Sequence, residues 1–160
     1  MNKVMVTGGA GYIGSHTCVK LIECGYEPVI IDNFSNTSIR NITGISNITK
    51  SKIKFYEIDC CDNEKLQRIM ETESDIIGVI HFAAHKSVEE SIKKPEKYYS
   101  NNLNSLNSLM KAMSVCKINN IIFSSSCTVY GNPDILPVNE SAPFKKAESA
   151  LGITKEALLM

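Results

Sequence analysis

The chain has 160 residues, and its 17 basic side chains balance its 17 acidic ones, so the formal net charge is zero. Hydrophobic residues make up 43% of the chain and charged residues 21%, which is typical of a globular domain and excludes a disordered one. The neutral balance does not favour a nucleic-acid surface, and no apolar run approaches the roughly 20 residues that cross a membrane.

Short apolar runs alternate along the chain with segments of helical periodicity. The apolar runs predict buried strands at residues 3–7, 28–32, 53–58, 76–82 and 121–125. The periodic segments predict helices at residues 12–24, 63–71, 95–117 and from 149 onward. Polar composition predicts a long loop at residues 33–51 that has room for one short helix, and three prolines and a glycine predict a loop at residues 128–147. Strands that alternate with helices predict an α/β fold with a doubly wound, Rossmann-like parallel sheet.

The first predicted strand runs into a glycine-rich turn, TGGAGYIG at residues 7–14, which opens the first predicted helix. Gly8 permits the tight turn out of the strand, Gly11 allows a pyrophosphate to approach the backbone, and Gly14 allows the helix to pack closely on the sheet. The helix N-terminus offers N–H groups and a positive dipole end to the phosphates. The position between strand and helix predicts a dinucleotide site here.

Asp32 ends the second predicted strand, at the distance from the glycines where an acidic residue binds the adenosine ribose hydroxyls. A carboxylate there repels a 2′-phosphate, and residues 33–37 contain no Lys or Arg that could hold one. The sequence therefore predicts NAD rather than NADP. The alternative is a structural glycine turn followed by an incidental Asp32.

Several longer stretches carry a resemblance to a known family. TGGAGYIGSHT at residues 7–17 is similar to the glycine turn of the extended short-chain dehydrogenase/reductases. HFAAHKSV at 81–88, PEKYYSNN at 95–102 and FSSSCTVYG at 123–131 are more specific. With DNFSN at 32–36 and with Asp59, they resemble the UDP-glucose 4-epimerases of the NAD-dependent epimerase/dehydratase family, over essentially the whole chain.

The resemblance implies an isomerase of galactose metabolism that interconverts UDP-galactose and UDP-glucose by transient hydride transfer to bound NAD. It implies that Ser126 hydrogen-bonds the reacting sugar hydroxyl and that Lys155 binds the nicotinamide ribose. The positions that the resemblance assigns to the cofactor are Gly8, Gly11, Tyr12, Ile13, Gly14, Asp32, Asn33, Phe34, Ser35, Asn36, Thr37, Asp59, Cys60, Phe82, Ala83, Ala84, His85, Lys86, Asn101, Ser126 and Lys155.

Four of these positions also have simpler interpretations. Asp59 could be a buried residue at a strand end, and Lys86 a solvated surface lysine. Asn101 could lie on the surface of its helix, and Ser126 could serve only to cap a serine-rich turn.

The catalytic motif Tyr-x-x-x-Lys of this family is incomplete. Lys155 is present in SALGITK at residues 149–155, but Leu151 occupies the Tyr position. Leucine cannot accept a proton, and loss of a general acid–base costs about 10²–10⁴ in rate. We therefore expect this chain to bind NAD and to turn over no substrate.

The sequence stops inside a predicted helix. We expect residues 1–160 to form one incomplete NAD-binding domain, without the last sheet strands and the UDP-sugar domain. The homodimer of the family uses helices near 95–117 and from 150 onward, and the second is cut short, so the sequence does not favour a dimer of this chain. No signal-peptide segment precedes the first strand, which predicts a cytoplasmic location.

Two other functions remain open. One is a non-catalytic NAD-binding or regulatory protein that pairs with a separately encoded second half. The other is a remnant of another sugar-nucleotide epimerase or dehydratase, which Cys127-Thr128 disfavours because dehydratases usually carry an acidic pair there. The six cysteines and three histidines show no zinc spacing, so we expect free thiols and no metal.

Overall fold

A computed structural model describes residues 1–159. These residues form two compact units, each described separately below. The first, called the sheet unit, comprises residues 1–83 and 105–124, and the second unit comprises residues 84–104 and those from 125 onward. None of the helices within residues 1–159 has the length and apolar character that a membrane crossing requires.

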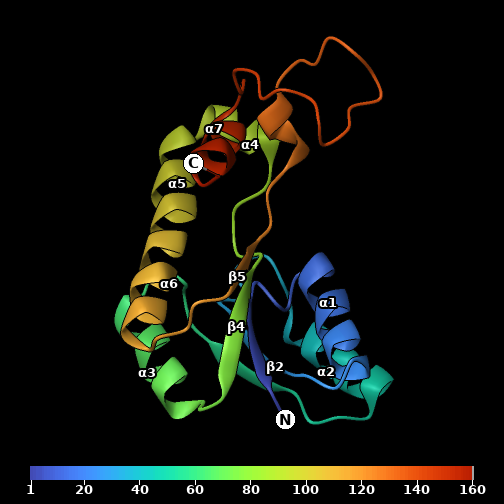
Figure 1. The fold of residues 1–160 in the computed structure, drawn as a ribbon, viewed down its shortest axis with the longest axis vertical. Helices are drawn as coiled ribbons and strands as arrows, with labels where there is room; N and C mark the ends of the chain where they lie inside the picture. The colour runs from blue at the N-terminus through green and yellow to red at the C-terminus, as the bar shows by residue number, and fades with distance from the viewer. Residues whose placement is uncertain (160) are drawn as a thin grey trace. The chain divides into compact units, whose positions relative to one another are not determined.

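The sheet unit is built on five parallel strands in the order β3-β2-β1-β4-β5 (Figure 1). This order starts near the middle of the sheet, moves to one edge and returns past the start to the other edge, which confirms the doubly wound, Rossmann-like fold. The strands are β1 (Lys3–Thr7), β2 (Glu27–Asp32), β3 (Lys54–Glu57), β4 (Ile76–His81) and β5 (Ile121–Phe123).

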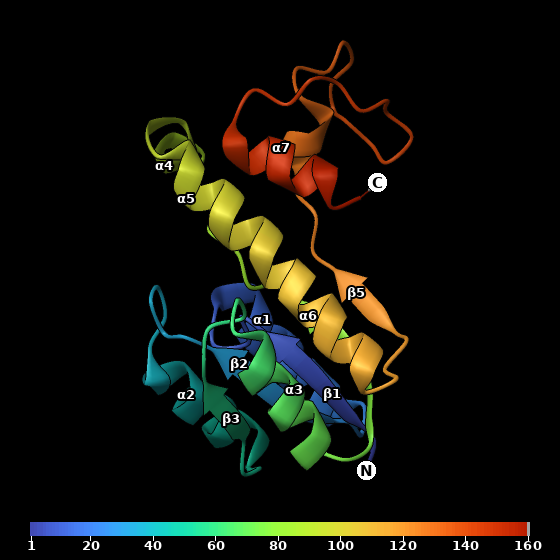
Figure 2. The same ribbon diagram turned by 90° about the vertical axis from the view of Figure 1, so that its left-hand side faces the viewer.

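Helices cover both faces of this sheet. Helices α1 (Tyr12–Glu23) and α2 (Ile39–Thr49) lie on one face, and α3 (Asn63–Thr72) and α6 (Asn104–Val115) lie on the other (Figures 1 and 2). Successive residues of the central strands point to opposite faces, so β1 contributes to both cores. Met5 packs with Leu66 and Leu109 under α3 and α6, whereas Val6 packs with Cys18 and Ile45 under α1 and α2.

Residues 33–51 are more helical than their composition predicted. Helix α2 has 11 residues, and the side chain of Ser38 caps it by accepting a hydrogen bond from the Arg40 amide. Ile42 and Ile45 are buried against α1 and the sheet. Isoleucines recur at every third position from Ile39 to Ile48, which is close to helical spacing, so the sequence carried a helix signal that the polar composition of the segment obscured.

The second unit contains short helices joined by loops. Its helices are α4 (Val88–Lys93), α5 (Pro95–Tyr98), the π-helix η1 (Tyr99–Leu103), the 3-10 helix η2 (Cys127–Tyr130) and α7 (Ala150–Ala157). Helix α4 was missed by the sequence analysis, although Ser87 caps it. The long predicted helix at 95–117 is α5, η1 and α6 in succession. A long loop leads from η2 to α7, as its prolines predicted (Figure 2).

Candidate functional site

The turn between β1 and α1 has the shape that its glycines predicted. Gly8 has φ +68°, and a Cβ atom there would lie 2.8 Å from the Ala83 nitrogen. A Cβ atom on Gly14 would lie 2.8 Å from the Gly9 Cα, so α1 approaches the turn too closely for any side chain. A Cβ on Gly11 would meet only the Gly8 carbonyl oxygen, at 3.1 Å, and would otherwise point into open space that a phosphate can use.

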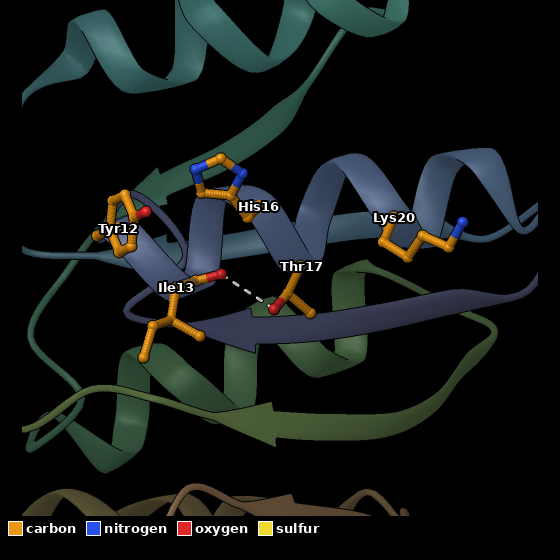
Figure 3. A pocket seen from close by; sticks show the side chains of 5 residues that line it. All are labelled: Tyr12, Ile13, His16, Thr17 and Lys20. Carbon is orange, nitrogen blue, oxygen red and sulfur yellow. Dashed lines mark hydrogen bonds between the residues drawn. The ribbon is translucent and has the colours of Figure 1, made fainter.

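Figure 3 shows the start of α1 from close by, where five side chains line a shallow surface hollow. Tyr12 and Ile13 are 75% and 60% exposed, and Thr17 donates a hydrogen bond to the Ile13 carbonyl at 3.0 Å. The first intrahelical bond runs from the Ser15 amide to the Gly11 carbonyl, so the amides of the first turn have no partner along the helix. These amides are available to an anion.

Asp32 is buried at the end of β2, where three protein donors hold its carboxylate. Oδ2 accepts a hydrogen bond from the Ala10 amide at 3.0 Å. Oδ1 accepts from the Phe34 amide and from the Thr37 hydroxyl, each at 2.9 Å. A carboxylate has about four acceptor positions, so room for one further donor remains. The arrangement places a fixed negative charge beside the glycine turn.

Asp59 follows β3 at the same edge of the sheet. It is an exposed residue, so the alternative of a buried strand-end carboxylate is wrong. Its carboxylate accepts hydrogen bonds from the Asn33 side chain at 3.0 Å and from the Cys61 amide at 2.8 Å. Cys60 beside it is buried, and burial raises the pKa of its thiol. A protonated, buried thiol contributes packing rather than redox chemistry.

The segment after β4 lies against the glycine turn. The Phe82 amide donates to the Thr7 carbonyl at 3.0 Å, and the Ala83 amide donates to the Thr7 hydroxyl at 3.4 Å. His81 is 1% exposed, and its Nδ1 lies 2.6 Å from the same hydroxyl, so this side chain belongs to the core. Fifteen of the predicted cofactor positions thus follow the carboxyl ends of β1 to β4 in the sheet unit: Gly8, Gly11, Tyr12, Ile13, Gly14, Asp32, Asn33, Phe34, Ser35, Asn36, Thr37, Asp59, Cys60, Phe82 and Ala83.

The other predicted positions belong to the second unit. Asn101 is half-buried, so it is not merely a surface residue of its helix, whereas Lys86 is exposed. Ser126 is the N-cap of η2, and its oxygen accepts hydrogen bonds from the Thr128 amide at 3.3 Å and the Thr128 hydroxyl at 2.9 Å. Both contacts use the Ser126 oxygen as acceptor, so capping leaves its own proton for donation. The remaining members are Ala84, His85 and Lys155.

Helix α7 carries Lys155 and Leu151 one turn apart, both buried. Burial lowers the pKa of Lys155 to about 8. Leu151 packs against Tyr98 and Ala150 in a small apolar cluster. The position that carries the catalytic Tyr in the motif is therefore part of the core of this unit.

Tyr98 belongs to this cluster, and two hydrogen bonds hold its hydroxyl. Its hydroxyl donates to Glu90 Oε2 at 3.0 Å and accepts from the Ser87 amide at 3.1 Å. Burial and the hydrogen bond to Glu90 raise its pKa. Tyr130 packs instead against the Phe144 ring, with centroids 5.6 Å apart.

Asn102, which was not among the predicted cofactor positions, contacts one of them, His85. Its side chain is buried and binds the loop before α4, accepting from the His85 amide at 2.9 Å and donating to the His85 carbonyl at 3.2 Å. It also donates to the Thr154 hydroxyl on α7 at 3.3 Å. Asn101 and Asn102 both lie in the π-helix, whose extra residue per turn the sequence pattern does not reveal.

A metal site is not formed in the part of the chain that the structure describes, where no group of three or more His, Cys, Asp or Glu side chains is placed to bind one.

Comparison with known proteins gave concordant results. The family model described as GDP-mannose 4,6 dehydratase matches residues 5–158. The UDP-glucose 4-epimerases of Dictyostelium discoideum and of Bacillus subtilis (strain 168) are each 46% identical to this chain. These alignments cover 96% and 95% of this chain and, in both cases, 44% of the relative.

Two solved structures are similar over 99% of the chain. The UDP-glucose-4-epimerase from Stenotrophomonas maltophila, with bound NAD and formylated UDP-arabinopyranose, has a TM-score of 0.94 at 40% identity. The UDP-glucose 4-epimerase from Bifidobacterium longum, in complex with NAD⁺ and UDP, has a TM-score of 0.94 at 39% identity. The chain covers 47% and 48% of these two structures, and so spans slightly less than half the length of the proteins it matches.

Proposed function

The chain belongs to the family that the GDP-mannose 4,6 dehydratase model describes, and we propose that it is a UDP-glucose 4-epimerase by descent that binds NAD but does not epimerise by itself. The observation that carries the proposal is the contrast between an intact glycine turn with Asp32 and a leucine at the catalytic Tyr position. The relatives that support it are epimerases, two of which contain NAD in their solved structures.

The residues of the sheet unit fit NAD. The open side of Gly11 and the amides at the start of α1 would hold the pyrophosphate, where the helix dipole favours negative charge. The remaining acceptor position of Asp32 would bind a ribose hydroxyl. Asp59 and Asn33 would lie at the adenine end, since both follow strands at this edge of the sheet.

Selectivity for NAD over NADP follows from Asp32. Its carboxylate is fixed by three donors and cannot swing away from a 2′-phosphate, so a phosphate there would face a like charge at short range. No Lys or Arg occurs in residues 33–37 to neutralise it. We infer that NADP binds much more weakly than NAD.

For catalysis, bound NAD supplies a hydride acceptor for C4 of a UDP-sugar. Ser126 would donate its hydroxyl proton to a substrate oxygen, which its capping contacts permit. Lys155 would hold a positive charge near the nicotinamide ribose, and with a pKa of about 8 it is still mainly charged at neutral pH. Leu151 offers no atom that accepts the proton of the sugar hydroxyl, so this position provides no general base for the reaction.

The test is a thermal melt of the purified chain with NAD and with NADP, followed by an assay of UDP-galactose conversion. NAD at 100 times its dissociation constant adds about 2.7 kcal/mol to stability, which raises the Tm of a chain this size by about 5–10 °C. We expect a smaller rise with NADP and no conversion. A cooperative melt without an NAD shift would refute the cofactor assignment, and measurable conversion would refute the lack of activity.

A further inference from the structure

Asn41 lies outside every motif singled out above, yet its side chain reaches the glycine turn. Its Nδ2 donates a hydrogen bond to the Ala10 carbonyl oxygen at 2.7 Å. Asn41 sits in the first turn of α2, which is fixed to the sheet by the burial of Ile42 and Ile45. Helix α2 therefore contacts the turn between β1 and α1 through one amide.

The Ala10 carbonyl needs such a donor. Ala10 is fully buried and lies one residue before Gly11, the N-cap of α1. The first carbonyl that α1 itself uses is that of Gly11, which accepts from the Ser15 amide at 2.8 Å. A buried carbonyl outside the helix costs free energy unless another group pairs with it, and Asn41 is that group.

Two consecutive peptide groups of the turn are held in this way. The Ala10 amide belongs to the peptide that Asp32 fixes through Oδ2 at 3.0 Å, and the Ala10 carbonyl belongs to the next peptide, which Asn41 fixes. The turn itself contains Gly8, Gly9 and Gly11, the residue type with the greatest backbone freedom. Without the hydrogen bonds to Asp32 and from Asn41, the turn would be mobile, and a pyrophosphate that binds would have to order it at a cost in affinity.

We propose that Asn41 is a positioning residue that orders the phosphate-binding turn from α2. The proposal rests on the proposed binding of NAD and adds a residue to it. Asn41 acts through Ala10 and need not touch the cofactor. Its removal should therefore weaken ligands that carry a pyrophosphate and leave unchanged the binding of adenosine, which lacks one.

The experiment compares Asn41→Ala, Asn41→Gln and the matched control Asn47→Ala, an exposed asparagine on the same helix. Affinities for NAD and for adenosine are measured by titration, and melting without ligand reports folding. We expect Asn41→Ala to bind NAD about 3- to 10-fold more weakly, the range for one lost hydrogen bond, with adenosine affinity unchanged within about twofold. Asn41→Gln, whose amide can reach the same carbonyl, should recover most of the NAD affinity, and Asn47→Ala should match the unmodified chain.

The outcomes separate this inference from the proposed function. If the unmodified chain binds no NAD, the proposed function and this inference both fail. If it binds NAD and Asn41→Ala binds equally well, or loses NAD and adenosine in parallel, only the role of Asn41 is overturned. If Asn41→Ala melts without cooperativity, Asn41→Gln decides. A folded glutamine variant with the NAD affinity of the unmodified chain supports the role, and a folded one that binds NAD more than 10-fold more weakly contradicts it.

Discussion

The glycine turn and helix α7 differ in how completely each contains the residues of its family motif. In the turn, the positions of Gly8, Gly11 and Gly14 agree with the backbone conformation and close contacts that a dinucleotide site needs. In α7, Lys155 of the motif is present, but the Tyr position is occupied by Leu151, which packs in an apolar cluster with Tyr98. The residues predicted to bind the cofactor and the position predicted to transfer a proton thus lie on different elements.

The largest expected effect is on the turn. Gly14→Ala places a Cβ atom 2.8 Å from the Gly9 Cα and inside contact distance of the Gly8 carbonyl, both rigid backbone atoms. We expect a loss of about 3 kcal/mol in stability by urea unfolding, together with loss of the NAD-induced rise in Tm. Gly44→Ala in α2 is the matched control, since a Cβ there meets nothing within 4 Å, and it should stabilise the chain by about 1 kcal/mol. Equal behaviour of the two variants would contradict the role of Gly14.

A smaller effect is expected at Asp32. Asp32→Asn replaces one carboxylate oxygen by an NH₂ group that faces protein donors, and it removes the charge. We expect the binding free energy of NAD to weaken by about 2 kcal/mol. The ratio of the affinity for NAD to that for NADP should also fall, measured by titration with both nucleotides. Glu57→Gln, which changes an exposed carboxylate at the paired position of β3, should alter neither affinity. An unchanged NAD/NADP ratio in Asp32→Asn would argue against charge repulsion as the source of selectivity.

The ion pairs of Glu73 are expected to affect the stability of the sheet unit but not its affinity for NAD. Glu73 is buried with ion pairs to Lys3 at 3.0 Å and Lys54 at 2.9 Å, and it also accepts from the Tyr56 hydroxyl. Burial alone would raise the pKa of Glu73, but these hydrogen bonds outweigh it and lower the pKa to about 2. Because the folded pKa is depressed, the stabilisation is complete above the unfolded value of about 4.3 and is lost as the pH falls toward 2.

Glu73→Gln should therefore cost about 1–3 kcal/mol at pH 7 and flatten the loss of stability between pH 4.5 and 2, measured by urea unfolding at each pH. Its NAD affinity should be unchanged at pH 7. Glu64→Gln is the control, because its carboxylate is 84% exposed and its pair with Arg68 contributes little. A Glu73→Gln variant with the same pH profile as the unmodified chain would show that this network does not govern acid stability.

The smallest expected effect concerns α7. Leu151→Tyr must fit a larger ring and a hydroxyl into a position that is 4% exposed, so we expect a loss of about 1–2 kcal/mol and no gain of UDP-galactose conversion. Ile153→Tyr, at a 40% exposed position of the same helix, should be neutral in stability and equally inactive. Turnover by Leu151→Tyr alone would show that the rest of the chain already provides a complete reaction site.

Several features of the molecule could be predicted from the sequence because each depends on neighbours close along the chain. The glycine spacing and the β-branched run before it predict the strand, turn and helix, and all three occur as expected. The end of β2 at Asp32 and the substitution at Leu151 are equally local. The place of Asp32 at the edge of the sheet also follows from the sequence, because the carboxyl ends of parallel strands meet at one edge.

Only the tertiary structure decided the contacts that join distant segments. Asn41 meets Ala10 across 31 positions of sequence, and Asn102 meets Thr154 across 52. No periodicity marks a polar side chain that will pair with a backbone carbonyl or a hydroxyl far away, since hydrogen bonding depends on where the two groups lie in space. The same holds for the burial of Leu151, whose loss of a hydroxyl was visible in the sequence but whose place in a core cluster was not.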